Sequence, residues 1–173
     1  MAWTIDPTHS QVNFSVRHMM ISKMGGRFGG FDGTFSLDEA NPPNSVVEGT
    51  IDVASVDTGN EHRDAHLRGA DYFDVENHPN MAFYSTNIEA VDEGSYQVTG
   101  DMTIKGVTRE VVFDVTDGGT CQDPWGNMRQ GLSATTKLDR RDFDLSSNMP
   151  LAGGGFVLGN EINVSIDLEL VQS

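Results

Sequence analysis

The chain has 173 residues, of which 37% are hydrophobic and 21% are charged, a composition typical of a folded domain rather than a disordered chain. Its 26 acidic and 11 basic residues give a formal net charge of -15, which repels nucleic-acid phosphates and anionic lipid headgroups. We therefore expect one domain over residues 1–173 and no nucleic-acid partner.

The sequence also indicates a cellular compartment. Cys121 is the single cysteine, so no intrachain disulfide can form and nothing points to an oxidising environment. No apolar run approaches the roughly 18 residues of a membrane-spanning helix. No basic and apolar leader precedes Trp3. We expect a cytoplasmic protein without an integral membrane segment.

Alternation of apolar and polar residues is the dominant pattern, and it predicts about eight β-strands. In chain order the predicted strands are residues 12–18, 31–37, 47–53, 81–85, 96–104, 111–115, 132–138 and 162–170. All six prolines lie between these runs, where a missing backbone donor does no harm. Residues 105–108 predict a tight hairpin, so neighbouring strands are expected to be antiparallel.

Two stretches break the alternation, residues 18–28 and residues 60–73, and one or both are expected to carry a short helix. Three consecutive glycines at 153–155 predict a flexible loop, since neither a following helix nor a lysine supports a phosphate site.

Every predicted strand has one apolar face, so the apolar faces must pack together in a sandwich or a closed barrel. Closure removes unpaired sheet edges, and about eight strands can enclose one small apolar ligand. We therefore favour an all-β, antiparallel barrel with one or two short helices.

Glycines interrupt the apolar face of three strands, at Gly33, Gly49 and Gly100. Two interpretations are open: the glycines let the strands bend as the barrel closes, or they leave room for a ligand. The other residues of that face are mostly aliphatic, Phe and Met, which suits binding by the hydrophobic effect better than acid or base catalysis.

His62 and His66 lie one helical turn apart, a spacing that can bring two imidazoles to one metal ion. A zinc-protease helix needs Glu directly after the first histidine, whereas here Arg63 would oppose the cation. No third ligand is apparent nearby, so we expect no metal site. The segment is instead predicted to cap one end of the barrel, with Arg63 or Asp64 pairing locally.

Enzyme signatures are sparse. The chain has no Gly-x-Ser-x-Gly elbow, no Walker loop and no dinucleotide-binding fingerprint. His18, on the apolar face at the end of its strand, is interpreted either as a hydrogen-bonded core histidine or as a contact to a ligand headgroup.

Seven segments, in order along the chain, resemble the YceI-like family of lipid- or polyisoprenoid-binding proteins. They are WTIDPTHS (3–10), FSVRHM (14–19), GRFGGFDG (26–33), RDAHLRGADYFD (63–74), GDMTIKGVT (100–108), WG (125–126) and LDRRDF (138–143). The resemblance implies a lipocalin-like barrel around a hydrophobic tunnel that holds an isoprenoid, such as a quinone or a prenyl diphosphate tail, or another long-chain lipid. It also implies a homodimer, and it supplies no catalytic set.

We therefore expect a non-enzymatic carrier or reservoir, with no cofactor beyond the bound lipid. The residues expected to hold the lipid are Phe14, Val16, His18, Met20, Phe28, Phe31, Phe35, Ile51, Leu67, Phe73, Phe83, Met102, Ile104, Phe113 and Leu138. Two alternatives stay open: a barrel enzyme that uses His18 or His66 on an apolar substrate, and an interaction or stress-response module whose barrel is filled by side chains.

Overall fold

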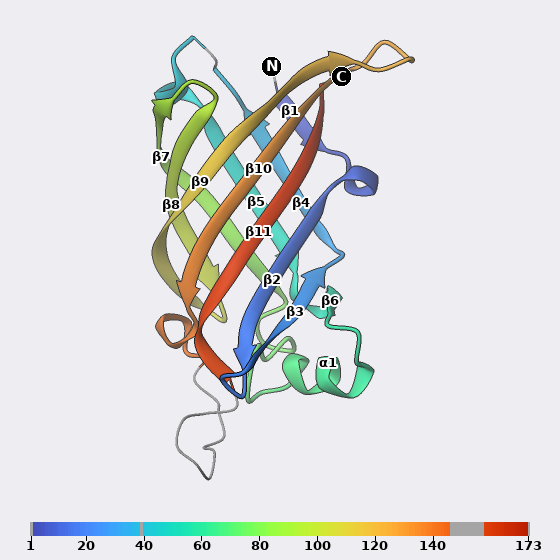
Figure 1. Ribbon diagram of the computed structural model, residues 1–173, viewed down its shortest axis with the longest axis vertical. Coiled ribbons are helices and arrows are strands. Elements are labelled where there is room, and N and C mark those ends of the chain that lie inside the picture. The colour runs from blue at the N-terminus through green and yellow to red at the C-terminus, as the bar shows by residue number, and fades with distance from the viewer. Residues whose placement is uncertain (1, 39, 146–157, 173) are drawn as a thin grey trace.

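A computed structural model describes residues 2–38, 40–145 and 158–172 and shows an antiparallel sheet that curls into a barrel (Figure 1). The strands are β1 (Ala2–Ile5), β2 (Gln11–His18), β3 (Ser22–Phe28), β4 (Phe31–Ser36), β5 (Val46–Asp52), β6 (Val56–Asp57), β7 (Asn80–Asp92), β8 (Ser95–Ile104), β9 (Val107–Gln122), β10 (Met128–Asp139) and β11 (Leu158–Gln172). The helices are η1 (Pro7–His9), η2 (Pro42–Asn44), η3 (Val53–Ser55), α1 (Glu61–Arg68) and η4 (Arg140–Phe143).

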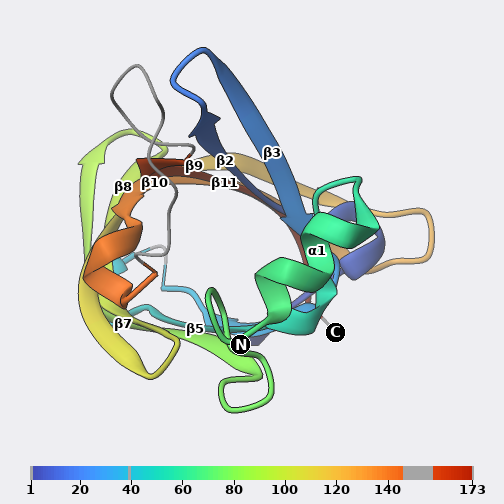
Figure 2. The ribbon, with the colours of Figure 1, turned by 90° about the horizontal axis from the view of Figure 1, so that it is seen from below.

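The barrel closes through eight strands in the order β1–β4–β5–β7–β8–β9–β10–β11, and pairing of β1 with β11 completes the ring (Figure 2). The long β11 also pairs with β2 over Leu158 to Asp167, so β2, β3 and β6 extend the sheet near α1. The predicted all-β barrel and its antiparallel hairpin at 105–108 are confirmed. The loop predicted at 153–155 lies outside the described residues.

The two stretches that break the alternation have different structures. The helix predicted in residues 60–73 is confirmed as α1, which begins after Asn60, whose side chain accepts a hydrogen bond from the Arg63 backbone N–H at 3.0 Å. The second short helix, left open for residues 18–28, does not form, because β2 and β3 make a hairpin there.

The physical reason for that break in the alternation is Gly26. Gly26 pairs with Phe14 across the hairpin. A Cβ atom on Gly26 would lie 2.4 Å from Cζ of Phe14, so the phenyl ring occupies the space of the missing side chain. The glycine therefore hides the alternation of a real strand. The short β1 was also missed, since four residues show too little of a pattern to be recognised.

The two ends of the barrel differ. The lower end in Figure 1 carries α1 and the β8–β9 turn, while the upper end carries η2 and both termini. A large apolar cluster reaches the lower end, where Val53, Val56 and Phe143 are at most 2% exposed. A second, smaller cluster surrounds Trp3 and Leu170. No helix among the described residues is long and apolar enough to cross a membrane.

Candidate binding cavity

An apolar cavity of about 190 Å³ lies inside the barrel. Its wall is formed mainly by inward-facing residues of β4, β5 and β7 to β11, with Ile5 of β1 and Val12 of β2, and it extends to Pro42 in η2, at the upper end. Alternation places these side chains inside, because every second residue of each strand points to the same face of the sheet. The cavity therefore extends from the upper end along much of the barrel, and no residue of α1 lines it.

Six of the fifteen residues predicted to hold a lipid line this cavity. They are Phe31, Phe35, Ile51, Phe83, Met102 and Phe113. The rings of Phe83 and Phe113 meet edge to face, with their centroids 5.1 Å apart. That these six residues contact a ligand stays a prediction.

Six other predicted residues belong to the packed core and do not line the cavity. They are Phe14, Phe28, Leu67, Phe73, Ile104 and Leu138. The centroid of the Phe28 ring lies 5.3 Å from that of Phe14 and 6.0 Å from that of Phe73. Aromatic rings at these distances are in close contact. The region near α1 is therefore filled by side chains, which sequence alternation could not show.

The last three predicted residues lie in and just after β2, away from the cavity wall. Val16 is buried at 4% exposure, and His18 is half-buried at the end of the strand. Met20 is 62% exposed in the β2–β3 turn, because its backbone has a φ of 65° and reverses the chain there. Met20 therefore points away from the cavity, and its contact with a lipid stays a prediction.

The three inward-facing glycines have different surroundings. A Cβ atom on Gly100 would lie 2.5 Å from both Cζ of Phe83 and the Tyr84 carbonyl oxygen, and one on Gly33 would lie 2.7 Å from the Glu48 carbonyl oxygen. These two glycines permit close packing. Gly49 lines the cavity, and its nearest neighbour would be 3.8 Å away. Of the three, Gly49 is the one that leaves room.

The wall also contains polar residues that sequence reasoning missed, notably Tyr96, Asp117 and Gln130. Gln130 shares the inward face of β10 with Leu132 and Ala134. Asp117 follows the inward-facing residues Phe113 and Val115 at the same two-residue spacing. Extending each predicted strand by two residues, which adds one inward-facing position, would have predicted both.

Charged residues of α1 form hydrogen bonds to Thr58 and to the segment that precedes it, where Nε of Arg68 donates to the Ala54 carbonyl oxygen at 2.9 Å. Nε of Arg63 donates to Oγ1 of Thr58, and Nη2 donates to the Thr58 carbonyl oxygen, each at 2.7 Å. The buried Asp64 carboxylate accepts from the Thr58 backbone N–H at 3.0 Å. His62 and His66 are both exposed, and Nε2 of His66 lies 3.8 Å from Oδ2 of Asp71. The helix thus uses its charged residues for local structure.

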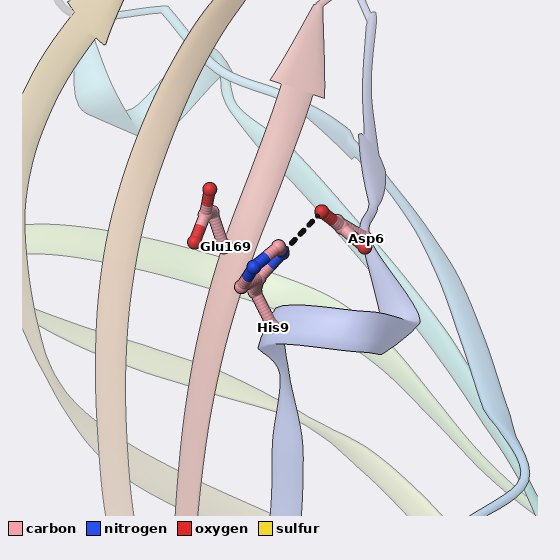
Figure 3. A group of neighbouring side chains, drawn as sticks. All are labelled: Asp6, His9 and Glu169. Carbon is pink, nitrogen blue, oxygen red and sulfur yellow. Dashed lines mark hydrogen bonds and ion pairs between the residues drawn. The ribbon is translucent and has the colours of Figure 1, made fainter. Parts of the chain in front are cut away.

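One group of possible metal ligands lies elsewhere, on the outside of the barrel. Ligand atoms of Asp6, His9 and Glu169 lie within 4.8 Å of one another (Figure 3). Nη1 of Arg129 already lies 2.7 Å from Oδ2 of Asp6 and 3.0 Å from Oε1 of Glu169. A guanidinium in this position competes with a metal cation for the same carboxylates. The arrangement is therefore an ion-pair cluster.

Charge pairing shifts the pKa values of this cluster. Hydrogen bonds from His9 and then Arg129 hold the pKa of Asp6 well below its usual range. The hydrogen bond from Arg129 lowers the pKa of Asp123 to about 2. The hydrogen bond to Asp6 raises the pKa of His9. The cluster thus links η1 to β10 and β11, and its hydrogen bonds stabilise the charged forms of Asp6 and Asp123.

Comparison with known proteins agrees with this architecture. A YceI-like domain matches residues 3–170. The UPF0312 protein of Ectopseudomonas mendocina is 43% identical over 141 residues, which cover 82% of this chain and 74% of that protein. The crystal structure of Burkholderia cenocepacia BcnA has a TM-score of 0.81 at 25% identity, covering 98% of this chain and 99% of BcnA. A polyisoprenoid binding domain from Saccharophagus degradans, implicated in plant cell wall breakdown, shares the fold with a TM-score of 0.67 at 17% identity, over 99% of this chain and 98% of that domain. The chain therefore belongs to the YceI-like domain family.

Proposed function

We propose that this protein binds an isoprenoid or a similar long-chain lipid inside the barrel and acts as its carrier or reservoir. The apolar cavity is the observation that carries the proposal, because its wall is built mainly from aliphatic and aromatic side chains. Burial of each ligand carbon contributes roughly 0.8 kcal/mol before the cost of ordering the ligand. A solved domain with the same fold is described as polyisoprenoid binding, which agrees with the proposal.

The size of the cavity limits the length of lipid that fits inside it. Its volume of about 190 Å³ is only slightly larger than that of engineered cavities of roughly 150 Å³ that bind benzene. A chain of several isoprene units must therefore extend beyond the upper end of the barrel or widen the cavity. Met81 and Met102 line the wall, and flexible thioether side chains can change rotamer to make room.

The test is native mass spectrometry of the purified chain, followed by organic extraction and identification of released lipids. We expect a bound lipid of long hydrocarbon character, or uptake of a supplied one. A Gly49→Val variant is the matched control, because its new side chain projects into the cavity. Repeated absence of any co-purifying or exchangeable lipid in the parent chain would contradict the proposal.

We further propose that binding is not coupled to catalysis. The enzymatic alternative assigned the chemistry to His18 or His66, and neither residue lines the cavity. His66 is exposed on α1. The alternative of a barrel filled by side chains requires an interior without free space, whereas this barrel contains a cavity.

We also propose, from the sequence, that the protein forms a homodimer, acts in transport and is located in the cytoplasm. Light scattering coupled to size-exclusion chromatography measures the mass in solution and distinguishes a dimer from a monomer of 18.8 kDa. Fractionation of cells that express the full-length protein tests the location, and transfer of a labelled isoprenoid between vesicles tests transport.

A further inference from the structure

Gln130 places a buried amide in the wall of a mainly apolar cavity. The residue is only 3% exposed, and its Nε2 donates to Oδ2 of Asp117 at 3.1 Å. Its Oε1 has less than 1 Å² of accessible surface and no hydrogen-bond partner among the described residues, so a ligand group reaches it only after a small movement of the Gln130 side chain. Buried acceptors are almost always paired in native proteins, because leaving one unpaired costs free energy.

Asp117 determines which end of the Gln130 amide is unpaired. A carboxylate can only accept hydrogen bonds, so the NH₂ group of the amide must face it and the carbonyl oxygen must point elsewhere. The other oxygen of Asp117, Oδ1, accepts from the Gly119 backbone N–H at 2.8 Å. The free hydrogen-bonding capacity in this part of the wall is therefore an acceptor, which needs a donor.

The charges around the cavity also restrict the headgroup of the ligand. The only charged residues among those lining it, within the described part of the chain, are the acids Asp32, Asp38 and Asp117, of which Asp32 is exposed on the outer face of β4. A phosphate or carboxylate headgroup would meet repulsion and no cationic partner there. An ammonium group would have to lose its hydration to enter the cavity. Asp117 would compensate this cost poorly, because both of its carboxylate oxygens already accept hydrogen bonds. A neutral hydroxyl group fits both conditions.

We infer that the lipid held in this barrel ends in a hydroxyl group, which donates a hydrogen bond to Oε1 of Gln130. The ligand class is thus a long-chain alcohol of isoprenoid type, in preference to the diphosphate or the acid of the same chain. This inference rests on the proposed function, and it specifies the headgroup that the cavity selects.

Three probes with one hydrocarbon chain test the inference: farnesol, farnesyl methyl ether and farnesyl diphosphate. Binding is followed by the fluorescence of Trp3, which is buried beside Leu132 and Leu168 of the cavity wall. The chain has two tryptophans, and the other, Trp125, is 81% exposed. A Trp125→Phe background therefore leaves Trp3 as the only reporter.

In this background we expect farnesol to bind roughly tenfold more tightly than the methyl ether, because the ether cannot donate a hydrogen bond. We expect the diphosphate to bind most weakly, and added salt to reduce its disadvantage. The Gln130→Met substitution should remove the preference for the alcohol over the ether. Gln97→Met, at an exposed position of β8, is the matched control and should keep the preference.

Each outcome has a definite meaning. Equal affinity for farnesol and its ether in the Trp125→Phe protein would show that Oε1 is satisfied in another way, and would overturn the inference while leaving the proposed function intact. Tightest binding of the diphosphate would overturn it as well. If none of the three probes binds, the proposed function itself fails.

A second variant guards against misfolding of Gln130→Met. In Asp117→Asn the amide of Gln130 is no longer held in one orientation, because asparagine can both donate and accept. Gln130 can then offer either end to the ligand, so the alcohol preference should shrink. An unchanged preference in a folded Asp117→Asn protein would contradict the role assigned to Gln130.

Discussion

At the scale of single residues, glycines in the same sequence pattern have opposite roles. Gly49 and Gly100 both replace an apolar residue on the inward face of a strand. The ring of Phe83 covers Gly100, whereas Gly49 faces the cavity. Whether a missing side chain creates space or is filled by a neighbour depends on residues from other strands. Local sequence therefore left both interpretations open.

Substitution of these glycines separates binding from stability. In Gly49→Val we expect farnesol to bind about 30-fold more weakly, because a new side chain displaces two or three ligand carbons at roughly 0.8 kcal/mol each. Stability should change little, since valine suits a strand. Titration monitored by Trp3 fluorescence measures the affinity, and urea denaturation measures the free energy of unfolding.

Gly100→Ala is the comparison for this substitution. Its Cβ would lie 2.5 Å from Phe83 and from the Tyr84 backbone, so we expect a loss of about 1–3 kcal/mol in the free energy of unfolding.

For Gly49→Val, an affinity equal to that of the parent would show that the ligand does not occupy the space beside Gly49.

At the scale of elements, an ion-pair cluster on the outside of the barrel stabilises η1, the connection between β1 and β2. The Asp6 carboxylate caps η1 by accepting from the Thr8 backbone N–H at 2.9 Å, and it also pairs with Arg129 of β10. Arg129 in turn contacts Asp123, with Nε 2.8 Å from Oδ2. These contacts lie beside the β1–β11 pairing that closes the barrel, so they support closure.

Replacement of Arg129 by methionine should lower the free energy of unfolding at pH 7 and make that free energy less dependent on pH in the acidic range. Pairing holds the pKa of Asp123 at about 2, below the ordinary value of 3.8. A lowered folded-state pKa contributes stability that is complete above the ordinary value and lost as pH falls through the folded value. The difference in unfolding free energy between parent and Arg129→Met should therefore shrink between about pH 4 and pH 2.

Chemical denaturation at a series of pH values measures this difference. Arg109→Met is the matched control, because the Arg109 side chain is exposed and donates to the carbonyl oxygen of the adjacent Thr108. A constant difference between parent and Arg129→Met across that pH range would contradict the role of the cluster.

At the scale of the whole molecule, the barrel is packed near α1 and hollow toward the upper end. The packed part includes contacts of Phe14, Phe28 and Phe73, which hold β2, β3 and the segment after α1 together. The hollow part leaves the smaller cluster of Trp3, Phe35 and Leu170 next to the cavity. A ligand in the cavity would complete the packing of this half.

Binding should therefore stabilise the entire fold. A ligand at 100 times its dissociation constant adds about 2.7 kcal/mol to the free energy of unfolding, which corresponds to a rise of roughly 5–10 °C in Tm for a domain of this size. Differential scanning calorimetry with and without farnesol measures the shift. A smaller shift is expected for Gly49→Val at the same farnesol concentration. An unchanged Tm of the parent chain at saturation would exclude binding that is specific to the folded barrel.

The sequence by itself determined most of the strands and their inward-facing residues, because alternation with a period of two is a local property that each strand carries. It favoured a barrel over a sandwich, and the pairing of β1 with β11 settles that choice. It also determined α1, whose capping residue Asn60 is adjacent in the chain. Where a glycine masks the alternation, as Gly26 does in β3, the same reasoning failed.

The tertiary structure alone decided which inward-facing side chains border free space and which fill the core. Phe28 and Phe31 are both inward-facing aromatic residues, yet the first is packed between Phe14 and Phe73 and the second lines the cavity. The unpaired oxygen of Gln130 likewise depends on Asp117, which lies on the neighbouring strand. Packing and hydrogen bonding at these positions depend on partners distant in sequence, so they become defined only when the sheet closes.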